Sequence, residues 1–331
     1  MRREECSECA LTEGSTSVNR MLKRTHTANG TMVQDRPLRD ILQKHSDWLQ
    51  GRGGEQAILR GATLSGLDLQ KTDLRKVILT GATFLDANLS NADFSQAQLI
   101  KCDFRNAILT GADFTAGDLT EVNFQHSLLA ESSFSEARIK ASLFRDATLR
   151  DSRLYEVRMQ SCDLTNANLS GSYLNLALIS DCWFTEADLE NCSFYRARFT
   201  SCRFTAARLM NANLSSIQAA KCDFRGAAVN SAKFGMSNLS HSTFCRAVMP
   251  NCDFRESNLS AADFSGAVLL NSIFTEANVM TTDFRGCVLE GARGLSARQL
   301  SDSLTSFNTI LPSGTRGPYV RGKNSEFAVT R

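Results

Sequence analysis

Residues 87–116 read ANLSN ADFSQ AQLIK CDFRN AILTG ADFTA, six units of five residues that share one pattern. The third residue of each unit is Leu or Phe, and the first is Ala or Cys. This register runs for 47 units from Leu59 to Leu289 without insertion or deletion, and every central residue is large and apolar except Ala219. A small residue stands two positions earlier in 42 of the 47 units. A short repeat sustained over this length is typical of stacked coils.

A period of five excludes the two common regular structures. An α-helix places same-face residues at spacings of three, four and seven, and a strand alternates every two. Phe occupies 17 of the 23 central positions in alternate units, whereas Phe199 is the only Phe among the other central positions. Cysteines also recur in the small position, many of them twenty residues apart: Cys102, Cys162, Cys182, Cys202 and Cys222. We therefore expect twenty residues per coil, four faces, and Phe on two opposite faces.

Units such as Ala87–Asn91, Ala112–Ala116 and Ala167–Gly171 match the consensus A(D/N)LXX. On these units the chain resembles the pentapeptide-repeat family over residues 57–293. The resemblance implies an all-β fold, a right-handed, parallel quadrilateral β-helix. Its central and small residues would point inward, and the other three residues of each unit would point outward. About 12 coils would make a rod about 55 Å long.

The unit around Ala219 tests this interior. Ile217 is large where a small residue is expected, and Ala219 is small where a large one is expected. Packed cores tolerate such exchanges because the total volume is conserved. We therefore expect both side chains to lie inside the coil.

The N-terminal part of the chain departs from the repeat. Residues 1–34 are rich in Ser, Thr, Arg and Glu, which predicts a disordered segment. Residues 35–56 predict a capping helix and a Gly-rich link, with Pro37 in the first helical turn and Gly51 after the last. The residues at helical spacing are Leu38, Ile41, Leu42, His45 and Leu49. We expect this helix to cover the first coil, since a solenoid needs capped ends.

The C-terminal part departs from the repeat after Ala292. Residues 294–311 predict a second capping helix, with Ser296 as N-cap, Leu295 as staple, and Leu300 and Leu304 on the helix. Residues 312–331 are basic and predict a flexible tail.

Composition narrows the class of protein. The net charge is +2, so no general attraction to nucleic acid or anionic lipid is expected. The sequence contains no run of 18 apolar residues that would span a membrane, and its start lacks the apolar core of a secretory signal. Eight of the 11 cysteines occupy the small inward position, which indicates buried thiols in a reducing compartment. We predict a cytoplasmic protein.

No residue set predicts catalysis, a cofactor or a metal. A straight column of inward cysteines does not converge as the four ligands of zinc must, and in-register vectors fit disulfide geometry poorly. The cysteines are therefore interpreted as structural filler. The four histidines lie at no metal-binding spacing and are interpreted as isolated surface residues: His26, His45, His126 and His241.

Outward charges form two candidate surfaces. The candidate acidic face consists of three residues one coil apart: Asp73, Asp93 and Asp113. The candidate basic face places three arginines in one column, with two more nearby: Arg138, Arg158 and Arg198, then Arg203 and Arg208. These charges indicate either a solvated surface or, for the arginines, contact with an anion such as phosphate.

An apolar column near the C-terminal end forms a candidate interface. Its members stand on outward positions of successive coils or beside them: Val248, Val268, Leu270, Ile273 and Val288. Exposed apolar columns often mark a contact surface. The C-terminal helix or tail folding back, or a homodimer through the C-terminal coils, would cover it. Alternatively, β-branched residues merely suit a strand.

We predict a non-catalytic protein-interaction scaffold, because solenoids present long rigid surfaces and nothing here predicts an enzyme. The partner is expected to be a protein rather than nucleic acid. One alternative is a bacterial secreted effector or secretion-system accessory protein, suggested by the Ser/Thr-rich head. Another comes from the family resemblance: a DNA mimic that regulates DNA gyrase or topoisomerase. Residues 57–293 carry 25 acids and 23 bases, which disfavours imitation of a polyanion.

Overall fold

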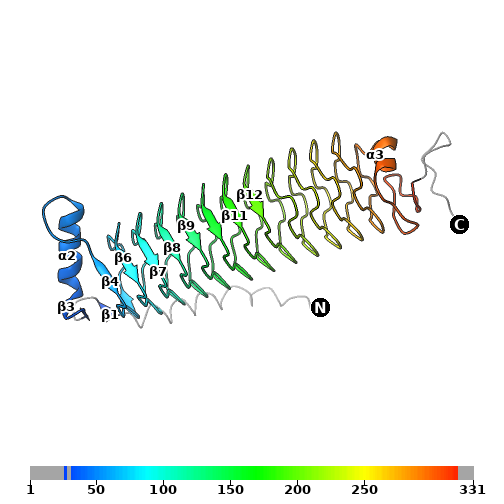
Figure 1. The fold of residues 1–331 in the computed structure, drawn as a ribbon. Coiled ribbons are helices and arrows are strands. Elements are labelled where there is room, and N and C mark those ends of the chain that lie inside the picture. Colours follow the sequence, from blue (N-terminus) through cyan, green and yellow to red (C-terminus); the bar gives the residue numbers. More distant parts are fainter. Residues whose placement is uncertain (1–25, 28–30, 320–331) are drawn as a thin grey trace, which may run out of the picture.

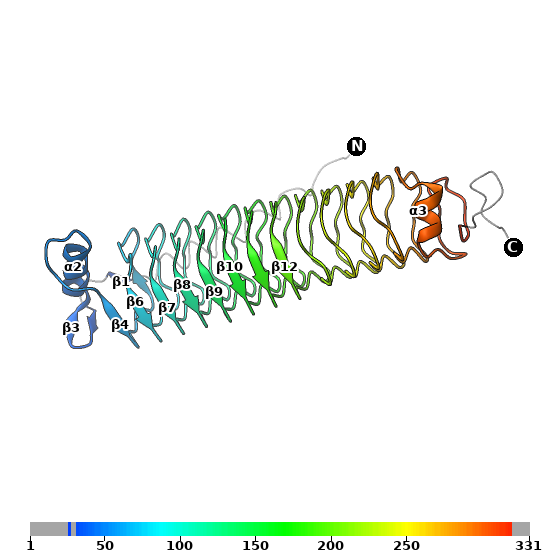
Figure 2. The same ribbon diagram turned by 45° about the horizontal axis from the view of Figure 1, so that its top comes forward.

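The computed structural model describes residues 26–27 and 31–319 as one straight rod of stacked coils (Figures 1 and 2). Helix α2 (Leu38–Leu49) lies at one end and helix α3 (Ala297–Asp302) at the other. Neither helix has the length and apolar character needed to cross a membrane. The fold is a parallel β-solenoid, as predicted.

One face of the rod carries a parallel sheet of eight short strands in the order β12-β11-β10-β9-β8-β7-β6-β4. Each strand pairs with the one twenty residues away; for example, Leu79 of β6 lies opposite Leu99 of β7. We call this the strand face. Its strands are β4 (Ile58–Arg60), β6 (Ile78–Thr80), β7 (Gln98–Ile100), β8 (Asp118–Thr120), β9 (Arg138–Lys140), β10 (Arg158–Gln160), β11 (Leu178–Ser180) and β12 (Arg198–Thr200).

The other three faces are held by single bridges with the same step of twenty residues, such as Asp73 to Asp93. On the strand face, the ladder runs from Ile58 to Asn278 in eleven such steps, so twelve coils are stacked. The predicted turn length of twenty residues is confirmed.

The interior is filled by the central and small residues of each unit. Phe84 stacks on Phe104 one coil away, with ring centroids 4.5 Å apart, and meets Phe94 of the opposite face edge-on at 6.4 Å. Offset stacks and edge-to-face pairs are the favoured aromatic geometries. Phe therefore lines two opposite faces, as predicted. Ile217 and Ala219 are both fully buried, so their exchange keeps the core filled.

Each corner of the coil uses one residue in the left-handed backbone region. This residue recurs at every fifth position from Gly61 to Gly291, with φ between 49° and 74°. Only Gly, and to a lesser degree Asn and Asp, adopts this conformation cheaply. Residues such as Leu176 and Thr281 adopt it because both flanking faces are locked by the stacked coils.

The N-terminal cap is built from three short strands and α2. Strand β1 (His26–Thr27) pairs in parallel with β5 (Leu67–Asp68), and β2 (Met32–Val33) forms a hairpin with β3 (Arg36–Pro37). Predicting disorder throughout residues 1–34 is therefore wrong for residues 26–27, which pair with β5 far along the chain. It is also wrong for residues 31–34, whose strand β2 pairs with the neighbouring β3. Residues 1–25 and 28–30 lie outside the described residues. Pro37 precedes α2 at the N-cap.

The C-terminal cap is mostly not helical. Ser296 and Gln299 form a capping box at α3, as the sequence predicts, but the helix ends at Asp302. Leu304, predicted to lie on the helix, instead bridges to Asp283. The predicted helix over 294–311 is too long because residues 303–310 return to the ladder of the last coil.

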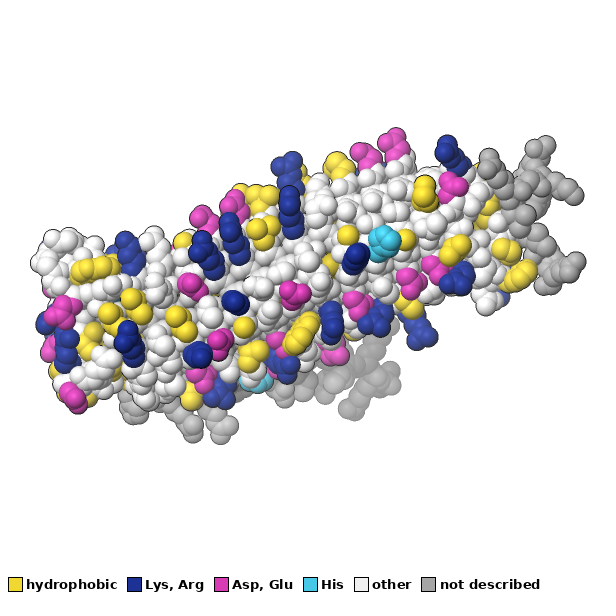
Figure 3. All heavy atoms as spheres, in the orientation of Figure 1, with side chains coloured by type: hydrophobic (Ala, Val, Ile, Leu, Met, Phe, Trp, Pro, Cys, Tyr) yellow, Lys and Arg dark blue, Asp and Glu magenta, His cyan; other side chains and the backbone are white. Residues whose placement is uncertain are grey.

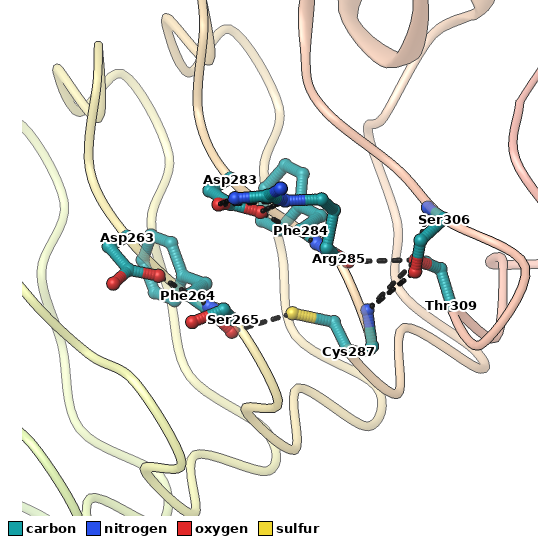
Figure 4. A network of polar contacts seen from close by, with 10 residues as sticks. Asp263, Phe264, Ser265, Asp283, Phe284, Arg285, Cys287, Ser306 and Thr309 are labelled. Atoms are coloured by element: carbon teal, nitrogen blue, oxygen red, sulfur yellow. Dashed lines mark hydrogen bonds and ion pairs between the residues drawn. The ribbon is translucent and has the colours of Figure 1, made fainter.

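Order continues into the predicted tail. Ile310 bridges to Val288 and then, antiparallel, to Arg316. The buried hydroxyl of Thr309 donates to the carbonyl of Phe284 and, with the Ser306 hydroxyl, accepts from the amide of Gly286 (Figure 4). The tail prediction is wrong for residues 312–319, and residues 320–331 lie outside the described part.

Candidate functional site

The inward cysteines form hydrogen bonds with backbone carbonyl groups. The thiols of Cys102, Cys162, Cys182 and Cys202 donate to the carbonyl oxygen two residues earlier, at the corner that follows the strand face. Ser142 makes the same contact with its hydroxyl. Burial raises the pKa of Cys102 to about 11 and that of Cys202 to about 12, so the thiols of these two residues stay protonated.

All described cysteines are free, and no group of three or more His, Cys, Asp or Glu side chains in the described residues could hold a metal ion.

His45 is not a surface residue. Its side chain is fully buried under α2, where Nδ1 accepts the amide of Ala57 at 3.1 Å. Nε2 therefore carries the proton and donates to the carbonyl of Arg75 at 2.9 Å. His126 and His241 are exposed, as predicted from their outward positions. The side chain of His26 lies outside the described residues.

The candidate acidic face is a real column, since Asp73, Asp93 and Asp113 follow one another in the ladder. Its charge is partly cancelled. Arg75 pairs with Asp73 at 2.7 Å and lies 3.7 Å from Asp93. The hydrogen bonds from Arg75 hold the pKa of Asp73 below its ordinary value.

The pairing of an Arg with the Asp two residues before it, which we call the Asp–Arg fork, recurs elsewhere in the rod. The other forks are Asp103–Arg105, Asp223–Arg225, Asp253–Arg255 and Asp283–Arg285.

The candidate basic face is divided by the structure. Arg138, Arg158 and Arg198 lie in one column of the strand face, with Leu178 between the last two. Arg203 and Arg208 belong to the two following faces, in ladders with Asp223 and Ala228. Arg208 also pairs with Glu190 at 3.3 Å. The five arginines therefore do not form one surface.

A shallow hollow of about 400 Å³ lies on the strand face across β8–β11. Figure 3 shows Lys and Arg over this part of the rod, with apolar and acidic side chains among them. The residues that line it are Asp118, Thr120, Arg138, Ile139, Lys140, Arg158, Met159, Gln160, Leu178 and Ser180.

The candidate apolar interface forms a ladder from Val248 through Val268 to Val288, and Ile310 extends it by one step. Val248 is 44% exposed. The described C-terminal residues thus prolong this column rather than lie across it. Leu270 and Ile273 are half-buried beside it.

An aromatic surface that was not predicted from the sequence lies on the face that carries the acidic column. Tyr155, Tyr173 and Tyr195 lie on three successive coils and are 44%, 54% and 37% exposed. We call these three residues the tyrosine patch. They are three of only four tyrosines in the chain, and the twenty-residue coil already places them on one face, so a signal existed.

Two polar residues hold the tyrosine patch. Asn175 accepts hydrogen bonds from the hydroxyl of Ser193 and the amide of Tyr195. The guanidinium of Arg196 lies 5.1 Å from the centre of the Tyr195 ring, within reach of a cation–π contact.

Family models described as "Pentapeptide repeats" match most of the rod. One matches residues 57–96, 87–125, 132–171, 142–181, 222–260 and 252–291, and another matches residues 164–208. Together they cover more than half of the chain. No curated protein matches it significantly.

Several solved structures of pentapeptide repeat proteins are similar to this chain. HetL, involved in heterocyst differentiation regulation in the cyanobacterium Nostoc sp. strain PCC 7120, is 21% identical, with a TM-score of 0.36 over 86% of this chain and 100% of that chain. QnrB1, a plasmid-mediated fluoroquinolone resistance protein, is 22% identical, with a TM-score of 0.22 over 54% of this chain and 84% of that chain. A protein from the Arabidopsis thaliana thylakoid lumen is 26% identical, with a TM-score of 0.16 over 37% and 68%.

Proposed function

The chain belongs to the pentapeptide-repeat family, and we propose that it is a non-catalytic protein-interaction scaffold whose main contact surface is the tyrosine patch. The observation that carries the proposal is the exposure of Tyr155, Tyr173 and Tyr195 on three successive coils of one face. Tyr and Arg are enriched at the centres of protein interfaces, where a few large side chains supply most of the binding energy.

The rod suits such a surface because it holds the side chains in place before binding. Each tyrosine stands beside a central residue that is fully buried, and Asn175 fixes the backbone at Tyr195. A tyrosine has few rotatable bonds, so little conformational entropy is lost on contact. Arg153 stands directly before Tyr173 in the ladder and adds a charged donor at the edge of the patch.

The buried thiols and the His45 ring, groups of the kinds that often perform catalysis, are occupied by structural hydrogen bonds. The buried thiols bond to backbone carbonyls, and His45 joins the cap to the first coils. This supports a binding role rather than an enzymatic one.

The two alternatives are weaker. A DNA mimic needs a continuous polyanion, yet residues 57–293 carry 25 acids against 23 bases, and Asp73 is paired with Arg75. The secreted-effector hypothesis depends on residues 1–34, most of which lie outside the described residues. It stays a prediction, as does the cytoplasmic location, and a translocation reporter fused to residues 1–50 tests both.

Affinity capture from the native cell, followed by quantitative mass spectrometry, tests the proposed scaffold. We expect the triple variant Tyr155→Ser/Tyr173→Ser/Tyr195→Ser to lose at least about 10-fold of the captured partner, equivalent to about 1.4 kcal/mol. The control Met236→Ser/Met280→Ser removes two exposed apolar side chains outside the patch and should retain the partner. The proposal is wrong if the triple variant captures the same proteins as the wild type.

A further inference from the structure

We propose that the hollow over β8–β11 binds the phosphoryl group of a phosphoserine or phosphothreonine in a partner protein. This inference rests on the proposed scaffold function and names the chemistry of one partner contact. Three cations line the hollow: Arg138, Lys140 and Arg158. Arg138 and Arg158 lie directly opposite each other on adjacent strands, and Lys140 ends the strand that Arg138 begins.

These three cations differ from the arginines of the rod that are held in Asp–Arg ion pairs. Within residues 31–319, every ion pair is made by other basic side chains. Arg105, Arg225 and Arg255, for example, are each held by the Asp two residues earlier. The outward position before Ile139 holds Arg138 itself, so no Asp can form that fork on β9. The cations of the hollow are therefore available to an external anion.

The charge and the donors match a phosphoryl group. Adjacent strands lie about 4.8 Å apart, so two guanidinium groups and one ammonium stand within reach of a single ligand. A phosphoryl group carries close to two negative charges and three acceptor oxygens, whereas one carboxylate is satisfied by one bidentate arginine. Gln160 and Ser180 supply further donors around the rim, whereas the Thr120 hydroxyl donates to Asp118.

The positive charge of the hollow covers only two adjacent strands, and this short extent favours a phosphorylated peptide over a nucleic acid. The strand before β9 presents Asp118 in the same column, and the strand after β10 presents Leu178. A nucleic-acid backbone carries a charge on every nucleotide and would continue over both residues. Leu178 is 42% exposed and offers an apolar contact to the side chain next to a phosphorylated residue.

Fluorescence polarisation with short degenerate peptides tests the site on the full-length protein. The probes are a labelled pool with a central phosphoserine, the same pool with serine, and a labelled single-stranded oligonucleotide; inorganic phosphate serves as competitor. We expect the phosphoserine pool to bind about 10-fold more tightly than the serine pool and more tightly than the oligonucleotide. Inorganic phosphate should displace it.

Matched variants assign the binding to the hollow. Arg138→Gln/Arg158→Gln should weaken binding of the phosphoserine pool about 30-fold. Arg203→Gln, an exposed arginine on the next face, should leave it unchanged. Arg138→Lys/Arg158→Lys keeps the charge but loses the bidentate geometry, and should give an intermediate loss. Leu178→Ser should weaken the peptide without changing the affinity of inorganic phosphate.

Three results would overturn the inference: equal binding of the two peptide pools, tighter binding of the oligonucleotide, or equal losses in Arg203→Gln and the Arg138→Gln/Arg158→Gln variant. Thermal unfolding of each variant confirms that the rod is intact, and the lysine variant provides the comparison if the glutamine variant is unstable. Phosphatase treatment of the captured partner separates this inference from the scaffold function. A partner that depends on the tyrosine patch but not on phosphate would refute only the site in the hollow.

Discussion

Replacing His45 should detach the N-terminal cap from the first coils. The ring joins α2 to two separate segments, because it accepts the amide of Ala57 at 3.1 Å and donates to the carbonyl of Arg75 at 2.9 Å. It also stacks on Trp48, with ring centroids 5.6 Å apart. No other residue type offers one acceptor and one donor in this rigid geometry.

His45→Ala leaves two backbone groups without partners, each of which costs about 1–3 kcal/mol when it stays buried. Because the end of a rod admits some water, we expect the stability of the cap to fall by about 3 kcal/mol, less than the upper limit for two unpaired backbone groups. His45→Gln retains an amide donor and acceptor, and should lose about 1 kcal/mol. The difference between the two variants isolates the hydrogen bonds from the change in volume.

Hydrogen exchange is the appropriate assay, because the ends of a solenoid open locally without global unfolding. A loss of about 3 kcal/mol corresponds to about 160-fold faster exchange of protected amides, and we expect it in residues 38–60 of His45→Ala. Amides of the central coils, such as Phe144, should exchange at the wild-type rate. If the Ala57 amide exchanges equally slowly in His45→Ala and wild type, the proposed role of the ring is refuted.

Acid should have the same effect. Burial lowers the pKa of His45 below its ordinary value, since the cation would be desolvated. The unfolded chain therefore takes up the proton first, and the stability of the cap falls as the pH drops below about 6.5 until the folded-state pKa is passed. His45→Gln should show no such loss between about pH 7 and pH 5. A flat wild-type profile over that range would contradict the prediction.

Three further predictions concern the core, the apolar column and a corner. Phe204 is fully buried between Phe184 and Phe224, whose ring centroids lie 4.9 and 4.7 Å away. Phe204→Ala should therefore lower the free energy of unfolding, measured in denaturant, by about 3–5 kcal/mol. A loss below about 1 kcal/mol would show that the coils collapse into the gap. Val268→Asp should reduce any self-association measured by light scattering, because it places a charge in the apolar column; an unchanged mass and melting temperature would leave the column as plain surface. Thr281 has a φ of 56°, which is unfavourable for a β-branched residue. Thr281→Asn should therefore raise the free energy of unfolding by about 1 kcal/mol. Destabilisation would show that the side-chain contacts of Thr281 outweigh the backbone strain.

Much of the fold could be predicted because its cause is local and repeated. The inward pair recurs in every unit, and even the exchange of Ile217 and Ala219 obeys the rule of constant volume. His45 also carried a signal, since it falls at helical spacing with Leu38 and Ile41, both of which are buried. Interpreting it as a surface residue gave too much weight to its polarity, although a buried ring can satisfy both nitrogens with backbone groups.

The ends were harder to predict because they lack the five-residue repeat that sets the register elsewhere. Leu304 joins Asp283, and His26–Thr27 joins β5, through long-range bridges that no local pattern encodes. The six-residue helix α3 is correctly begun by Ser296, but its end is decided by the ladder that residues 303–310 enter. Local capping signals therefore located the start of this cap and not its extent.

By itself, the sequence determined the length of a turn, the two side chains that face inward on each wall, and the number of coils. These follow from steric fit within a few residues, and each unit repeats the same solution. Only the tertiary structure decided which outward residues act together. Arg138 and Arg158 are twenty residues apart and become neighbours only when the coils stack. Stacking also decides some of the ion pairs, since it brings Glu190 beside Arg208.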